Sequence, residues 1–481
     1  MKKIFILAVA MAMIAIPVLA QENYSAWQAY KTVTINTTSS GANIANPVMQ
    51  YPVLVRLGTP DSDVFAAAKT DGADVRFSKV DGTHLPYQID QWDGTGKTAA
   101  IWVLLDTVKG NAATAVNMYF GNTAAADSSN GKAVFTAANG FAAVYHLDED
   151  SGSTASGSAI YKDATGIQAA GANNVTVAGN DGYIGRGTVF GDTVNNTHTD
   201  YIDLGTWEPS DTQMTFSAWV KYTPSNIGGT WYVIVAKRDT WGTGTMRWEF
   251  YENNSNAEVG GTGTSQLTQY SGNTGDSTYF HVYQEALQPG VWTQVTWTTI
   301  NGGLSGLYFN GVPSSTSTAV TFNWGTAATA DLKIGQTDVS GEGFAGTIDE
   351  ARFSSIIRSA DWINLDYQTQ KLGTTAITLG PAIPNAAVLA NRTNLSHSNV
   401  FDALQIGRSI MFRIPENAGH ATISLIALSG RTVTTINAEK GVRELTWKGN
   451  LVAGSYIARL TFANSNNGER VIQETRIPYN P

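Results

Sequence analysis

The 481-residue chain contains no cysteine, which excludes disulfide bonds and any zinc site built on thiolates. Charged residues are scarce too, because Asp, Glu, Lys and Arg make up 14% of the chain, against about 25% in an average soluble protein. The net charge of -9 argues against nucleic acid as a partner, since nucleic-acid-binding proteins present basic patches. We therefore expect stability to come from a large hydrophobic core or from ions held by oxygen ligands.

Long apolar runs are absent after the first 20 residues. A transmembrane helix needs about 18 or more consecutive apolar residues, so no transmembrane segment is expected. Residues 1–20 combine Lys2 and Lys3 with a short apolar run and end in Val18-Leu19-Ala20, which is the pattern of a signal peptide cut before Gln21. This pattern predicts a secreted protein.

Motifs of nucleophilic and metal-dependent catalysis are missing. The six histidines, at positions 84, 146, 198, 281, 397 and 420, do not form the His-Glu-x-x-His spacing of zinc enzymes. No Gly-x-Ser-x-Gly motif of the α/β-hydrolases occurs either. The histidines are therefore expected at the surface or in ordinary hydrogen bonds.

Two carboxylates do stand side by side, Asp349 and Glu350 in the segment GTIDEARF. Successive side chains of a regular strand point to opposite faces, so we expect these two to face away from each other. Glycoside hydrolysis needs two carboxyls that face each other about 5 to 10 Å apart. Glu249 and Glu252, three positions apart, fail the same test. Only carboxylates that meet from different strands escape this argument.

Glycine, threonine, serine and asparagine are abundant, and short apolar runs between them are typical of strands and turns. The sequence predicts an all-β, multi-domain protein: a central two-sheet concanavalin A-like jelly roll flanked by smaller β-sandwich domains. The first module, residues 21–138, contains the segments YPVLVRL, GADVRF, LPYQID, IWV and YFGN. In this order they resemble the domain of unknown function twenty-three forty-one. The resemblance implies a β-sandwich companion domain of secreted proteins and no particular activity.

The second module, residues 139–375, begins with HLDEDSG and continues through FSAWV, LYFNG and IDEARF. Asn310-Gly311 predicts a two-residue hairpin turn, and Ser359 is the expected cap of one helix. These landmarks resemble the LamG-like, concanavalin A-like jelly roll. The resemblance implies a two-sheet lectin-type fold that binds glycans, proteins or lipids, sometimes with calcium.

A polar linker, residues 376–399, precedes the third module at residues 400–481. The charge balance changes there, since residues 386–481 hold ten Lys and Arg against six Asp and Glu. The module reads as a small β-sandwich and resembles C-terminal sorting domains of the type IX secretion route; the matching residues are Gly430, Arg431, Trp447, Gly454, Tyr456 and Arg459. The resemblance implies the outer-membrane secretion machinery as a partner and an extracellular or cell-surface location on a Gram-negative bacterium. An ordinary adhesion-type sandwich is the alternative.

Two interpretations of Asp349 remain open. In the first, it joins Asp148 and Asp163 as a ligand of structural calcium, which takes 6 to 8 oxygen ligands. In the second, Asp349 caps a turn or accepts backbone amides, and Glu350 pairs with Arg352. Apart from calcium, no cofactor is expected.

Aromatic residues are the other candidates for a site, because sugars stack their C–H faces on exposed rings and hydrogen-bond to nearby amides. Trp219, Trp292 and Trp297 are expected to pack in the core, and Trp324 is a weaker ligand candidate. Trp241 is the best one, since the segment DTWGTG places it in a polar loop. The full expected set is Trp241, Trp231, Trp248, Asn253 and Tyr270.

These observations favour a secreted, non-catalytic protein whose jelly roll binds a polysaccharide or a glycoprotein glycan. One alternative is a structural or adhesive surface protein that makes protein–protein contacts. The other is a polysaccharide-degrading enzyme whose site is assembled across strands.

Overall fold

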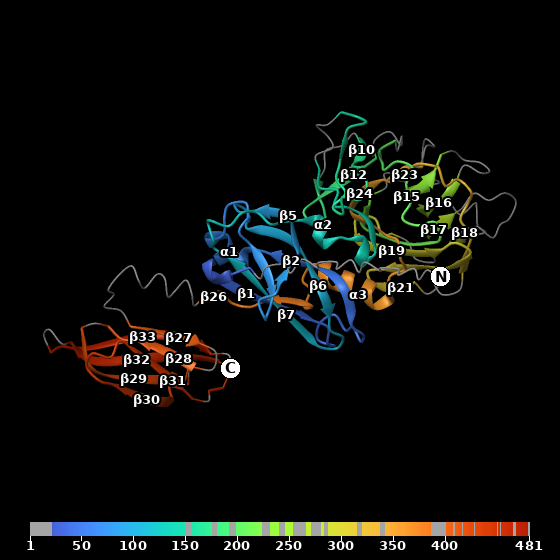
Figure 1. The fold of residues 1–481 in the computed structure, drawn as a ribbon. Coiled ribbons are helices and arrows are strands. Elements are labelled where there is room, and N and C mark those ends of the chain that lie inside the picture. Colours follow the sequence, from blue (N-terminus) through green and yellow to red (C-terminus); the bar gives the residue numbers. More distant parts are fainter. Residues whose placement is uncertain are drawn as a thin grey trace, which may run out of the picture. The chain divides into compact units, whose positions relative to one another are not determined.

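The computed structural model describes residues 22–149, 155–175, 180–191, 199–223, 231–239, 246–253, 266–270, 280–282, 287–314, 320–336, 342–385, 401–406, 409–415, 417–427, 429–449, 451–452, 454–464 and 468–479. The chain divides into two compact units, one with residues 31–382 and the other with residues 23–30 and 383–481. Both consist mainly of antiparallel strands (Figure 1), which confirms the expected all-β, multi-domain fold class. No helix in the described ranges has the length and hydrophobicity needed to cross a bilayer.

The first part of the larger unit contains two sheets. Their strand orders are β25-β1-β7-β3-β4, where β25 is Ile377–Leu379, and β2-β6-β5. In the second sheet, β2 and β6 are near-continuous apolar runs, and Val53 lies opposite Val103. Such runs are typical of strands that are covered on both faces. The elements are β1 (Ala29–Asn36), β2 (Val48–Leu57), β3 (Arg76–Lys79), β4 (His84–Leu85), β5 (Tyr87–Asp93), β6 (Thr98–Val108), β7 (Ala113–Phe120), α1 (Ser62–Ala67) and α2 (Gly131–Val134).

The jelly roll in the same unit is made of an eight-stranded and a nine-stranded sheet. The eight-stranded sheet has the order β18 (Phe280–Val282), β17 (Gln266–Tyr270), β16 (Met246–Asn253), β15 (Trp231–Arg238), β23 (Leu332–Ile334), β13 (Tyr201–Asp203), β10 (Gly171–Asn174) and β9 (Ala159–Tyr161). The nine-stranded sheet has the order β11 (Asn180–Asp181), β12 (Arg186–Phe190), β24 (Gly346–Ser354), β14 (Gln213–Tyr222), β19 (Trp292–Ile300), β20 (Gly303–Phe309) and β21 (Val312–Pro313), with β8 (Phe141–Tyr145) paired to β24 and β22 (Val320–Phe322) paired to β20. The two sheets share one hydrophobic core, which includes Phe216, Trp297 and Phe353.

Two local predictions for the jelly roll are confirmed. Asn310 (φ +50°) and Gly311 (φ +78°) form the two-residue turn between β20 and β21, and left-handed φ at both positions is what a type I′ hairpin requires. Helix α3 (Ala360–Gln370) begins after Ser359, whose hydroxyl accepts a hydrogen bond from the Trp362 amide at 3.2 Å.

Helix α3 joins the jelly roll to the first module. The Tyr51 hydroxyl on β2 shares a hydrogen bond of 2.6 Å with the Thr369 hydroxyl on α3, and the Tyr51 ring lies edge-on to Trp362 with 5.7 Å between centroids. After α3 the chain adds strand β25 (Ile377–Leu379) to β1 of the first module. Residues 31–382 therefore share buried contacts across the expected boundary between the first two modules.

The second unit contains two small sheets, with strand orders β27-β28-β31 and β30-β29-β32-β33. Buried Phe412, Ile423 and Leu460 belong to their common core. The strands are β26 (Ile383–Pro384), which pairs with residues 29–30, then β27 (Asp402–Ile406), β28 (Ser409–Arg413), β29 (Ala418–Ala427), β30 (Thr432–Ala438), β31 (Glu444–Lys448), β32 (Gly454–Asn464) and β33 (Arg470–Tyr479).

Candidate functional site

Strand β24 is irregular where it carries the two adjacent carboxylates. Glu350 has a φ of +54°, in the left-handed region. The pairing with β14 also shifts register, because Asp349 lies opposite Trp219 while Arg352 lies opposite Ser217. Two residues of β24 therefore oppose one residue of β14, which is a β-bulge.

The bulge turns both carboxylates to the same side of the sheet. The jelly-roll core takes Ile348, Ala351 and Phe353 from this strand, a spacing of three and then two, whereas a regular strand keeps a spacing of two. Asp349 and Glu350 thus both point away from the core. The expectation that they face away from each other is wrong, because alternation fails where the bulge adds a residue.

Both carboxylates are sealed from solvent, each with an exposed fraction of 0%. Residues of the first module lie over this side of the sheet: Asp90 on β5 approaches the neighbouring His146, and the Arg352 guanidinium is 4.9 Å from the centroid of the Trp102 ring on β6. A polysaccharide cannot reach Asp349 or Glu350 in this arrangement.

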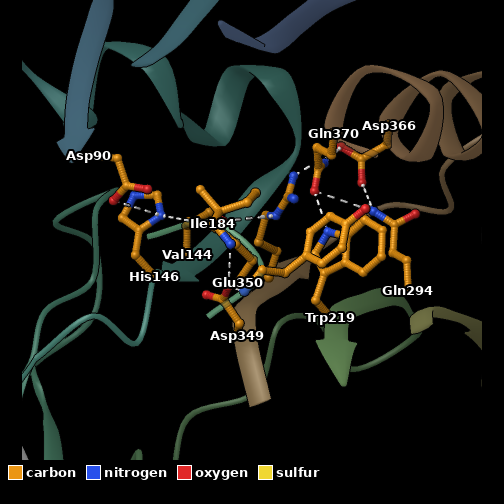
Figure 2. A network of polar contacts seen from close by, with 12 residues as sticks. Asp90, Val144, His146, Ile184, Trp219, Gln294, Asp349, Glu350, Asp366 and Gln370 are labelled. Carbon is orange, nitrogen blue, oxygen red and sulfur yellow. Dashed lines mark hydrogen bonds and ion pairs between the residues drawn. The ribbon is translucent and has the colours of Figure 1, made fainter. Parts of the chain in front are cut away.

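His146 lies between Glu350 and Asp90, as Figure 2 shows. Its Nδ1 is 2.7 Å from a Glu350 oxygen and 3.6 Å from an Asp90 oxygen, and its Nε2 is 3.3 Å from the Gln88 amide oxygen. Burial alone would lower the pKa of His146, but the charges of Asp90 and Glu350 outweigh burial and raise this pKa to about 10. Burial raises the pKa of Asp90 to about 7. His146 is therefore the cation that holds two buried carboxylates together.

Arg352 extends this network toward helix α3. Its guanidinium is 3.4 Å from the second Glu350 oxygen and donates to Asp366 at 3.0 Å. Burial would lower the pKa of Arg352, but Asp366 and Glu350 raise it. The cation therefore stays charged although it is buried, and it links strand β24 to the helix.

Asp366 in turn holds the side-chain amides of Gln370 and Gln294, which lie close to Trp219. Its carboxylate accepts hydrogen bonds from Gln370 at 2.6 Å and from Gln294 at 2.8 Å. The Gln370 amide oxygen then accepts the Trp219 indole N–H at 2.7 Å. Figure 2 shows this chain of contacts, which orients the Trp219 ring on the outer side of the nine-stranded sheet.

Asp349 holds the turn that follows β11. One of its oxygens accepts the backbone amides of Tyr183 and Ile184, each at 2.7 Å. Gly182 is required here, since a Cβ would lie 2.5 Å from the Arg186 backbone and 2.7 Å from the same Asp349 oxygen. Burial first, and then the charge of Glu350, raise the pKa of Asp349 well above its ordinary value. The turn thus carries Tyr183 across the face of the sheet.

Four aromatic side chains gather where this turn meets the sheet and the helix, and we call Trp292, Tyr183, Trp219 and Tyr367 the aromatic row. Tyr183 stacks on Trp219 with 3.4 Å between centroids and 15° between planes. Trp292 lies edge-on to Tyr183 at 5.9 Å, and Tyr367 lies 5.8 Å from Trp219. Trp219 is buried, whereas the other three rings are half-buried. The three half-buried rings therefore leave ring surface accessible to a ligand, and the buried Trp219 ring supports them.

The first module contacts the aromatic row through Arg56. Arg56 on β2 donates hydrogen bonds to the Tyr183 carbonyl at 2.9 Å and to the Gln370 carbonyl at 3.3 Å. Its guanidinium is also 5.7 Å from the centroid of the Tyr183 ring. Arg56 therefore ties the turn and the helix to the first module.

Two residues of the expected ligand site lie wholly or partly outside the described residues. Trp241 lies outside the described residues. Tyr270 belongs to strand β17, and its side chain lies outside the described part. Trp324, the weaker candidate, is 4% exposed and donates its indole N–H to the Thr299 hydroxyl at 3.0 Å. It belongs to the core and presents no ring face to a ligand.

The other three expected ligand residues lie on strands β15 and β16. Trp248 is 0% exposed and packs edge-on against Trp297 in the core. The expectation that it stacks on a sugar is therefore wrong, because this side chain of β16 points into the core. Asn253, on the other side of β16, is buried and lies opposite Trp231. Trp231 is half-buried.

The three expected calcium ligands are not a group whose ligand atoms lie within 4.8 Å of one another in the part of the chain that the structure describes. Asp148 is exposed. One oxygen of Asp163 accepts the Val144 amide at 2.9 Å and the Thr165 amide at 3.0 Å, and one oxygen of Asp349 accepts two amides, as described above. Both oxygens of Asp163 accept hydrogen bonds and so have fewer lone pairs for a cation. The second oxygen of Asp349 is buried and has no hydrogen-bond partner among the described residues.

Among the described residues, the group of His and carboxylate side chains whose ligand atoms converge within 4.8 Å is Asp90, His146 and Glu350. One nitrogen and two oxygens are a donor set that a divalent metal accepts. The contact of 2.7 Å between His146 and Glu350 is nevertheless an ordinary charge-assisted hydrogen bond. The ion pairs account for this group without a metal.

Sequence reasoning missed most of the aromatic row. Trp292 was expected in the core and is half-buried at the surface instead, whereas Trp219 and Trp297 are buried as expected. Tyr183 carried a usable signal, because it stands in the Gly-flanked polar segment NDGYIGRG, the same kind of context that favoured Trp241. Asp90 carried none, since its partners are far away in sequence.

Comparisons with known proteins find the two kinds of domain that were expected for the first two modules. Residues 71–165 match the family model of a domain of unknown function (DUF2341), and residues 195–364 match that of the concanavalin A-like lectin/glucanases superfamily. The chain thus contains both kinds of domain, as the sequence motifs predicted. The resemblance of the C-terminal module to sorting domains stays a prediction. No curated protein matches the chain.

Solved structures give weak likenesses. Domain 4 of AbnA, a GH43 extracellular arabinanase from Geobacillus stearothermophilus, has a TM-score of 0.33 at 21% identity, over 47% of this chain and 98% of that one. A Trypanosoma rangeli sialidase has a TM-score of 0.32 at 10% identity, over 60% of this chain and 45% of the sialidase. A SAP-like pentraxin from Limulus polyphemus has a TM-score of 0.27 at 13% identity, over 41% and 92%. At this level the likenesses carry no argument about function.

Proposed function

We propose that this protein is a secreted or cell-surface carbohydrate-binding protein whose jelly roll holds a polysaccharide or a glycoprotein glycan without cleaving it. The observation that carries the proposal is the aromatic row on a domain of the concanavalin A-like lectin/glucanases superfamily. Three half-buried rings at a surface supply the C–H stacking area that sugar recognition uses.

A rigid base favours such binding, because less conformational freedom is lost when the ligand is held. Trp219 is fixed by its hydrogen bond to Gln370, and Tyr183 is fixed by Asp349 below and Arg56 beside it. The two stacked rings, Trp219 and Tyr183, are therefore already arranged before a sugar binds.

Binding is favoured over hydrolysis by the burial of the paired acids. Asp349 and Glu350 face one side but have no exposed surface. Each one is engaged with protein groups, Asp349 with two amides and Glu350 with His146 and Arg352. General acid and base catalysis needs carboxyls within reach of the substrate.

The test is retention on a panel of immobilised polysaccharides, with release of reducing ends measured in parallel. We expect the wild type to be retained by at least one polysaccharide and Trp292→Ala to lose that retention. The matched control is Trp231→Ala, because it removes another half-buried tryptophan from the opposite sheet. Loss in Trp231→Ala alone would refute the row as the site. Retention by nothing would refute carbohydrate binding and favour a structural or adhesive role, and released reducing ends would establish an enzyme.

We also propose export through the signal peptide of residues 1–20 and sorting through the C-terminal module. Support comes from Gly430 with φ +83° in the turn before β30, and from Tyr456 and Arg459 on β32, which stand at the positions of the sorting-domain motif. Expression in a bacterium with the type IX route, with and without residues 400–481, tests this. Equal amounts of both forms outside the cell would refute the role of the module.

A further inference from the structure

We propose that the aromatic row selects an anionic polysaccharide, one that carries carboxylate or sulfate groups, through two lysines at its ends. This inference rests on the proposed function of the same site. It adds the chemical class of the ligand, which the superfamily match does not give.

Lys221 marks one end of the row. It lies directly opposite Trp292 in the pairing of β14 with β19, and its ammonium is 5.1 Å from the centroid of that ring. Because both residues are half-buried, the ammonium is held beside a ring that remains partly accessible. A cation within about 6 Å of a ring face gains cation–π attraction.

Lys371 marks the other end. It follows directly after α3, and its ammonium is 5.8 Å from the centroid of the Tyr367 ring. This lysine is half-buried as well, and the next residue, Leu372, is exposed. The row is thus bounded by a flexible cationic side chain on each side, one from the sheet and one from the helix.

Neither lysine has a carboxylate partner among the described residues. By contrast, Lys31 lies 2.9 Å from both Asp61 and Asp63. In a chain with a net charge of -9, two ammonium groups that make no ion pair within the described ranges thus lie beside half-buried rings of the row. They complement negative charge on a ligand that the rings hold.

The aromatic rings and the two lysines can contact the same ligand. A sugar ring stacked on Trp292 or Tyr367 projects its substituents past the edge of the aromatic ring, where an ammonium on a flexible stem can reach them. A carboxylate or sulfate there forms a charge-assisted hydrogen bond. Neutral hydroxyls gain less from the same lysine, so the lysines discriminate by charge while the rings supply most of the contact area.

The test compares three probes: polygalacturonate, the same polymer after reduction of its carboxyl groups, and a sulfated galactan. We expect one or both anionic probes to bind about tenfold more tightly than the reduced polymer, and to lose affinity as NaCl rises from about 50 to 500 mM. In Lys221→Gln/Lys371→Gln the preference should disappear, while the reduced polymer binds as before. The two anionic probes show whether carboxylate or sulfate is preferred.

Lys333→Gln is the matched control, because Lys333 on β23 of the other sheet also lies beside a ring, 5.4 Å from the centroid of Tyr201. An equal loss in this control would overturn the inference, since charge anywhere on the chain would then suffice. Equal affinity for anionic and reduced polymer would overturn it too, but would leave the proposed carbohydrate binding standing. If no probe binds here and none binds in the wider panel, the proposed function itself fails.

Discussion

Replacing His146 with glutamine should destabilise the chain strongly. His146 is the positive charge between Asp90 and Glu350, at 3.6 and 2.7 Å, and the side chains of all three are at least nine-tenths buried. Removing one member of a buried ion pair costs about 3–5 kcal/mol, because a charge is left uncompensated away from water. Glutamine is close in size, so the loss reports charge more than packing. We expect the free energy of unfolding to fall by that amount.

Urea denaturation followed by tryptophan fluorescence measures the effect, and a double-mutant cycle assigns it. Glu350→Gln removes one of the carboxylates that His146 compensates. The double variant His146→Gln/Glu350→Gln should therefore be more stable than the sum of the two single losses predicts, by about 1–3 kcal/mol. Additive losses, within about 0.5 kcal/mol, would refute the reasoning.

The pH dependence of the same unfolding free energy gives an independent check. The pKa of His146 is raised in the folded chain from 6.5 to about 10, so its stabilisation is complete below pH 6.5 and is lost as the pH rises toward 10. The raised pKa of Asp90, about 7, also makes stability fall with rising pH, but mainly below pH 7. The decline between pH 7 and 10 should therefore be present in the wild type and much smaller in His146→Gln. A wild-type stability that stays constant over this range would contradict the assignment.

Three further outcomes are expected. Trp219→Phe keeps a ring against Tyr183 but loses the 2.7 Å hydrogen bond to Gln370, so urea denaturation should show a loss of about 1–3 kcal/mol, together with weaker polysaccharide retention. Trp248→Ala leaves a cavity in the jelly-roll core and should cost about 3–5 kcal/mol, seen as a lower urea midpoint with an unchanged slope. Treatment with EDTA should leave the melting temperature within about 1 °C, because Asp148 is exposed and both oxygens of Asp163 already accept hydrogen bonds; a fall of several degrees would show that a structural ion is bound.

Most of the fold could be predicted from local sequence. Strand and turn patterns gave the all-β class, and two local features were predicted correctly: the Asn310-Gly311 turn and the Ser359 cap. These features depend on neighbours within a few residues, so the sequence contains the information directly. Motif order was also sufficient for the two domain resemblances.

The site could not be predicted in the same way. The bulge at Glu350 depends on how β24 pairs with β14. The sequence of β24 alone predicts a regular strand, whose successive side chains point to opposite faces. Asp90 and Arg56 reach their partners from another module, more than 50 residues away in sequence. Trp292 belongs to a strand whose sequence is typical of the core. It is the first residue of that strand, however, and is only half-buried, whereas the next seven residues are buried. Local patterns therefore gave the elements, and long-range packing decided which side chains meet.

The bonds from Arg56 to the Tyr183 and Gln370 carbonyls have a consequence for engineering. A jelly roll excised near residue 138 as a fusion tag would lose these bonds and uncover the Glu350–Arg352 pair to water. The unit to transfer is therefore residues 31–382 as a whole. If one of its two modules is exchanged for that of a homologue, the contact residues of the other module have to be exchanged with it.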